Sequence, residues 1–169
     1  MQYNQKKHPI TLYFGIAFFY FILFLITRIP GLSLKINNST PFLLLPALIA
    51  GTIFFKEWFG FIGGIFLGLL QDSVQITGCF NLIALMLLGA IAGIAAAHFL
   101  NQNIRATVAL TFVISLIYFL LKWFIFIFLK SKEDAFIYLI EISLPSVLYT
   151  TVFAVPFYFL FKWVNNKFL

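Results

Sequence analysis

Charged side chains are scarce in this sequence. They make up 9% of its 169 residues, whereas soluble domains carry about a quarter charged residues. Hydrophobic residues instead make up 63% of the chain. A soluble domain of this length leaves much of its surface in water and would have to expose many of these apolar side chains. The composition therefore excludes an ordinary soluble domain and predicts an integral membrane protein.

Residues that carry catalysis or bind metals are also few. The single cysteine, Cys79, permits no internal disulfide and no thiolate metal cage. His98 lies at the end of an apolar run and has no partner at metal-binding spacing. Ser73, a candidate nucleophile, has no nearby base, and no phosphate-binding loop accompanies it. The sequence therefore predicts no enzyme activity, no metal site and no cofactor.

Cations outnumber acids. Eleven Lys and Arg against five Asp and Glu give a formal net charge of +6. The cations stand at the ends of apolar runs and form no continuous stripe, which is typical of membrane topology signals rather than of contact with nucleic acid. The lipid bilayer is therefore the expected surrounding, and no nucleic-acid partner is expected.

The apolar runs predict an all-α fold, a polytopic membrane helical bundle of about six spans with short loops in one domain over residues 1–169. The spans are expected at approximately residues 10–27, 41–55, 59–71, 81–100, 106–129 and 143–161. No small-residue cleavage motif follows the first run, so an uncleaved span is expected there. The second and third runs are short, so residues 41–71 form either two tilted or broken helices or a re-entrant hairpin.

Lys and Arg also predict the orientation, because they resist translocation across the membrane. With six spans, one side carries six of these residues and the other carries four. The first set is Lys6, Lys7, Lys56, Arg105, Lys162 and Lys167, and the second is Arg28, Lys35, Lys130 and Lys132. This bias predicts that both termini lie in the cytoplasm.

Small residues recur at a spacing of four in two neighbouring runs. Gly60, Gly64 and Gly68 line one face of the third predicted helix, and Gly89 and Gly93 repeat the spacing in the fourth. Such faces let helix backbones approach closely in lipid. The pattern predicts that these two helices pack against each other or against a partner protein.

Asp72 follows the glycine-rich run directly. A carboxylate there lies either at the membrane edge or in the interior, where it needs a partner. The structural interpretation is a capping and loop-fixing role, favoured because Gln71, Ser73 and Gln75 surround it with hydrogen-bonding groups. The functional interpretation is an ion or substrate site.

Lys122 lies inside the fifth run, and Glu141 follows the next polar turn. If both helices are regular, the two residues are at similar distances from that turn, which allows a buried ion pair. The alternative is an interfacial segment over residues 135–142 with Glu141 in water, because Pro145 suits the first turn of a helix.

The stretch from Gly60 to Gly93 resembles the central region of the rod shape-determining protein MreD family. It contains a glycine-bearing helix that ends in a Gly-Leu-x-x-Asp element, then a short glycine turn and a small-residue helix. The matching positions are Gly60, Gly64, Gly68, Leu69, Asp72, Gly78, Asn81, Gly89 and Gly93. The segment Leu144-Pro145-Ser146, with Pro156 after it, is similar to the family's final span.

This resemblance implies a noncatalytic component of the bacterial inner membrane that supports cell shape and lateral-wall peptidoglycan synthesis. The implied partners are the MreC scaffold, the MreB filaments, and the RodA glycosyltransferase with its transpeptidase. The glycine face and Asp72 would then serve helix docking. The alternative is a substrate-capture subunit of an energy-coupling-factor vitamin transporter, which is similar in length and six-helix plan.

Overall fold

The computed structural model describes residues 10–29, 41–55, 57–75, 78–98, 102–129 and 135–168. Within these ranges the chain is almost entirely helical and contains no strand, which confirms the predicted all-α fold. The helices are α1 (Ile10–Arg28), α2 (Leu44–Phe55), α3 (Glu57–Asp72), α4 (Phe80–His98), α5 (Ile104–Trp123), α6 (Ala135–Tyr138), α7 (Leu144–Val152) and α8 (Ala154–Phe168). Two π-helical segments, η1 (Phe124–Phe128) and η2 (Leu139–Ser143), continue α5 and join α6 to α7.

Three helical stretches are long and apolar enough to cross a membrane. They cover Phe80–His98, Ile104–Phe128 and Phe136–Lys167. Three shorter apolar helices cover Phe14–Arg28, Leu44–Phe55 and Trp58–Asp72. The predicted membrane character is thus supported, and the region predicted as two short spans or a re-entrant hairpin forms two separate short helices, α2 and α3.

The last helical stretch is longer than the predicted span at residues 143–161. The chain is already helical from Ala135 and continues through Pro145. A proline inside a regular helix clashes with the carbonyl four residues before it. The π-helical turn η2 ends two residues before Pro145 and changes the hydrogen-bond register there. The helix therefore does not have to begin at the proline.

α2 is the central helix of the bundle. All of its residues, Leu44–Phe55, are buried, and it packs against α3, α4, α5 and α8. A helix that short does not span the hydrocarbon core unaided, since about 20 residues are needed. Its position inside the protein provides the protein cover that short or irregular segments need at membrane depth.

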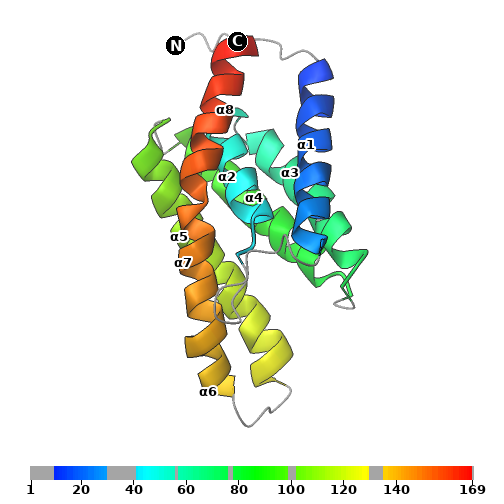
Figure 1. Cartoon of the computed structure of the whole chain (residues 1–169), viewed down its shortest axis with the longest axis vertical. Coiled ribbons are helices and arrows are strands. Elements are labelled where there is room, and N and C mark those ends of the chain that lie inside the picture. The colour runs from blue at the N-terminus through cyan, green and yellow to red at the C-terminus, as the bar shows by residue number, and fades with distance from the viewer. Residues whose placement is uncertain are drawn as a thin grey trace.

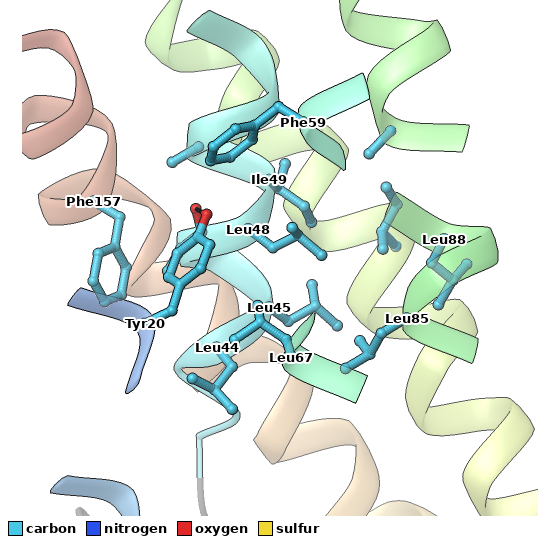
Figure 2. Close-up of a cluster of buried hydrophobic side chains, with 14 of the residues drawn as sticks. Tyr20, Leu44, Leu45, Leu48, Ile49, Phe59, Leu67, Leu85, Leu88 and Phe157 are labelled. Atoms are coloured by element: carbon cyan, nitrogen blue, oxygen red, sulfur yellow. Dashed lines mark hydrogen bonds between the residues drawn. The ribbon is translucent and has the colours of Figure 1, made fainter. Parts of the chain in front are cut away.

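The core around α2 is built from aliphatic residues and aromatic rings. Figure 2 shows Tyr20 of α1 beside Leu48 of α2 and Phe157 of α8. The Tyr20 hydroxyl donates a hydrogen bond of 3.3 Å to the carbonyl of Ala47. Phe59 of α3 lies at a ring-centroid distance of 6.3 Å from Tyr20. The first and last helices are thereby joined to the centre of the bundle.

The helices extend to different positions along the long axis of the bundle. The start of α1 and the end of α8 lie at the same end (Figure 1). At the other end, α5 with η1 and α6 with η2 form a hairpin that projects beyond the end of α1 (Figure 1). The stretch Ile104–Phe128 has 25 residues, whereas α1 has 19. At about 1.5 Å per residue the longer helix reaches roughly 9 Å further.

Cys79 offers a test of the predicted orientation, because it is the only cysteine, it is exposed, and it lies in the turn between α3 and α4. With both termini in the cytoplasm, this turn faces the outside. A membrane-impermeant maleimide is therefore expected to label Cys79 in intact spheroplasts.

The matched control is Asn166→Cys in a Cys79→Ser background, which moves the only thiol to the exposed end of α8. That thiol should react only after the membrane is permeabilised. Labelling in the reverse pattern would mean that the termini lie outside.

Candidate interaction site

The glycine face of α3 lies directly on the backbone of α4. A Cβ atom added at Gly60 would collide with the carbonyl oxygen of Gly89, and one added at Gly64 would collide with the carbonyl oxygen of Leu85. The contact is reciprocal, because a Cβ at Gly89 would collide with the carbonyl oxygen of Gly60. Glycine is therefore required at these positions for the two backbones to lie in contact.

The same face continues to the end of α3. A Cβ at Gly68 would crowd the Cα of Leu82 and the carbonyl oxygen of Asn81. Gly93, further along α4, is also buried. Of the two interpretations left open by the sequence, packing of the two helices on each other describes this structure. The glycine face is thus enclosed within the chain.

Asp72 binds the first turn of α4. Its Oδ1 accepts hydrogen bonds from the Asn81 backbone N–H (3.2 Å) and the Asn81 side-chain Nδ2 (2.8 Å), and its Oδ2 accepts one from the Leu82 backbone N–H (2.7 Å). The first N–H groups of a helix have no partner within the helix, and a negative charge there interacts favourably with the helix dipole. The geometry is that of a cap, as the structural interpretation of Asp72 expects.

The turn between α3 and α4 contains a residue in the left-handed backbone region. Gly78 has a φ of +63°, which L-amino acids other than glycine rarely adopt. Asp72, at the end of α3, and Gln75, early in the turn, both accept hydrogen bonds from Asn81 at the start of α4. Glycine at this position lets the chain reverse and bring the start of α4 onto the Asp72 carboxylate.

Asn81 connects this turn to α5. Its side chain is fully buried, its Nδ2 also donates to Gln75 Oε1 (3.3 Å), and its Oδ1 accepts a hydrogen bond of 2.7 Å from the Tyr118 hydroxyl. The Tyr118 ring is stacked on Phe42 with centroids 5.0 Å apart. Every polar atom of the Asn81 side chain thus has a partner, which is what a buried amide in a membrane protein requires.

Two cations lie near this network. Arg28, the last residue of α1, donates from Nη2 to the Oε1 of buried Gln71 at 3.1 Å. Lys122 lies on α5 four residues after Tyr118 and is half-buried. The sequence allowed an ion pair between Lys122 and Glu141. No such pair is present in the described part of the chain, because Glu141 lies on an exposed part of η2.

The sequence analysis missed a set of buried hydroxyl residues on α5 and on the segment that includes η2 and α7, which pack against each other. Three of these residues lie on α5 and three on the other segment. They are Thr107, Thr111, Ser115, Ser143, Ser146 and Thr150. Thr111 and Thr150 each donate to the carbonyl four residues before them at 2.7 Å, and the Thr150 hydroxyl also accepts a hydrogen bond of 3.1 Å from the Phe42 backbone N–H. The spacing of four in Thr107, Thr111 and Ser115 was the available signal.

Comparison of the chain with models of known protein families, with curated proteins and with solved structures finds no match. The function is therefore argued from the residues and their geometry.

Gly64→Ala is expected to lower the free energy of unfolding by about 1–3 kcal/mol, because the added methyl group overlaps the Leu85 carbonyl and separates α3 from α4. Thermal unfolding of the purified protein in detergent measures the change. Gly15→Ala is the matched control, since a Cβ at this α1 position meets open space. Equal melting temperatures for the two variants would contradict the close approach of the two helices.

Asp72→Ala is expected to destabilise the protein by about 1–3 kcal/mol, because it leaves two helix N–H groups and the Asn81 amide without their acceptor. Tyr118→Phe removes the other partner of Asn81 and is expected to cost less. Since both act through one side chain, the double variant should be less destabilised than the sum of the two. Ser73→Ala, which removes an exposed hydroxyl bonded within its own helix, is the control.

Proposed function

We propose that this chain is a noncatalytic membrane subunit that supports cell shape and lateral-wall peptidoglycan synthesis by binding other membrane proteins through its helices. The residues that resemble the MreD family motif support this proposal through their structural roles, which are a close helix contact and a helix cap. Gly60, Gly64, Gly68 and Gly89 let two helices lie in contact, and Asp72 caps the second of them. In this proposal the motif builds a rigid helical hairpin that serves as a docking platform in the bacterial inner membrane.

The observation that carries the proposal is the outward face of this hairpin. Opposite its buried inner face, α4 presents four apolar residues at spacings of four, four and three, each 51–56% exposed. They are Ile83, Leu87, Ile91 and Ile94, and we call them the α4 outer ridge. Residues at these spacings form a straight ridge along a helix, which packs into the groove of a neighbouring helix.

The α4 outer ridge takes the docking role that the sequence suggested for the glycine face. Since α4 covers the glycine face, a partner helix has access only to the other side of the hairpin. A cap at one end of α4 and a backbone contact along its length hold the ridge in a fixed orientation. Fixed orientation favours binding, because little conformational freedom is lost on association.

The proposed partners are those implied by the resemblance. They are the MreC scaffold, the MreB filaments, and the RodA glycosyltransferase with its transpeptidase. A helix–helix contact within the bilayer suits the membrane-spanning members of this set, whereas filaments in the cytoplasm would be reached through them.

The rival function is that of a vitamin-capture subunit, and it needs polar groups that remain available to a ligand. Gln71, Asp72, Gln75 and Asn81 are the polar residues gathered at one end of the bundle. They bond to one another, to Arg28 and to Tyr118. This arrangement favours a structural network over a vitamin pocket.

Affinity purification of the tagged protein from gently solubilised bacterial membranes, followed by mass spectrometry, tests the proposal. The wild-type chain is expected to recover the MreC scaffold and the cell-wall synthases. Leu87→Trp with Ile91→Trp should lower that recovery by at least tenfold, because two bulky rings interrupt the α4 outer ridge. Val113→Trp, which places the same ring on an exposed site of α5, is the matched control.

Equal amounts of each variant in the membrane fraction show that insertion is intact. Recovery of an ATPase with a transmembrane coupling subunit would replace the proposal by the transporter. Undiminished recovery of the scaffold by the double tryptophan variant would reject the ridge as the docking surface.

A further inference from the structure

The α3–α4 hairpin is short relative to a lipid bilayer. α3 has 16 residues, begins at Glu57 and ends at Asp72, so an acidic residue stands at each end. At about 1.5 Å per residue this helix is roughly 24 Å long. The hydrocarbon core of a typical bilayer is about 30 Å thick. Tilting the helix would shorten its extent across the membrane further, so tilt does not remove the difference.

The outward face of this hairpin is apolar over an even shorter length. The α4 outer ridge runs from Ile83 to Ile94, which is roughly 17 Å of helix. Exposed His98 follows the ridge at one end, and Asn81 lies in the polar network at the other. The exposed apolar residues of α3 are Trp58, Ile62 and Leu69. Lipid chains thus meet a short apolar surface on this side of the bundle.

The side of the bundle formed by α7 and α8 is longer. The apolar stretch Phe136–Lys167 has 32 residues and runs along the length of the bundle in Figure 1. Its exposed apolar residues extend from Phe136 to Trp163, about 40 Å of helix. Measured only between the charged residues Glu141 and Lys162, it still covers roughly 32 Å. This side therefore matches the hydrocarbon thickness that the α3–α4 hairpin does not reach.

We propose that the α3–α4 side of the chain thins the bilayer beside it. A bilayer adjusts its thickness to a short apolar surface, because the alternative places polar groups in hydrocarbon. The long α7–α8 side of the same bundle prevents the whole chain from fitting a uniformly thin bilayer. The membrane around this protein therefore differs in thickness from one side to the other, and short acyl chains are favoured beside α4.

This inference deepens the proposed function, and its consequence for docking rests on that function. Thinning costs free energy as long as lipid lies against the short face. A partner helix that covers the α4 outer ridge displaces this lipid and removes the cost. A partner helix with a short apolar stretch of about 16 residues fits a thinned bilayer better than one with the usual 20 or so.

Quenching of tryptophan fluorescence by brominated lipids measures which lipids lie beside a chosen position. The three native tryptophans are replaced by phenylalanine, and one tryptophan is introduced at Leu87 on α4 or at Leu148 on α7. These positions are 53% and 59% exposed. The protein is reconstituted into vesicles of mixed dimyristoleoyl- and dierucoyl-phosphatidylcholine, with one of the two lipids brominated at a time. Leu87→Trp is expected to favour the short-chain lipid by about threefold, and Leu148→Trp is expected to show no such preference.

Lengthening the short face should abolish this preference. Ser73 lies four residues after exposed Leu69, and His98 lies four residues after exposed Ile94. His98→Leu with Ser73→Leu therefore extends the apolar surface by one turn on each helix. In the Leu87→Trp protein these changes should bring the ratio of short-chain to long-chain binding to about one. Asn166→Leu, which adds the same side chain at the exposed end of α8, is the matched control and should leave the ratio unchanged.

Equal binding of the two lipids at Leu87→Trp, or the same ratio at Leu87→Trp and Leu148→Trp, would overturn the proposal. A preference that survives His98→Leu with Ser73→Leu would also overturn it, because apolar length would then not be the cause. The vesicles contain no other protein. Their result is therefore separate from the recovery of cell-wall proteins, so the thinning and the proposed function can fail independently.

Discussion

The backbones of α3 and α4 touch at Gly60 and Gly64, where no side chain separates them from the carbonyl oxygens of Gly89 and Leu85. In lipid the hydrophobic effect does not drive helices together, so close contact of this kind is the main source of their attraction. The contact fixes how far apart the helices lie and in which register. It therefore sets where Asp72, at the end of α3, stands relative to the first N–H groups of α4.

The polar network follows from this registration. Asp72 caps α4, and the Asn81 side chain accepts a hydrogen bond from Tyr118 of α5. Gln71 accepts a hydrogen bond from Arg28 of α1. Four helices are thereby joined by polar groups at one end of the bundle. Without water, each buried donor and acceptor has to find a partner within the protein. Such a network is specific, because a shift of one turn in any of the four helices would leave several groups unpaired.

The proposed docking surface depends on this construction. The α4 outer ridge is apolar and straight, and it suits another helix within the bilayer. The α3–α4 contact orients the ridge, and Asp72 fixes the start of α4 by capping it.

The sequence by itself determined that the chain lies in a lipid bilayer and that its fold is helical. Few charges and long apolar runs require a bilayer, and in a bilayer a chain satisfies its backbone hydrogen bonds most simply as helices. It also marked Gly60, Gly64, Gly68 and Asp72, because glycine at a spacing of four and a carboxylate after an apolar run are local patterns, whereas Asn81 was marked only by the family resemblance. Local patterns do not say which neighbour fills a face. Only the tertiary structure decided that α4 covers the glycine face, that α2 is enclosed, and that Arg28 is bonded to Gln71. These are relations between residues far apart in the chain, and they depend on how all the helices pack at once.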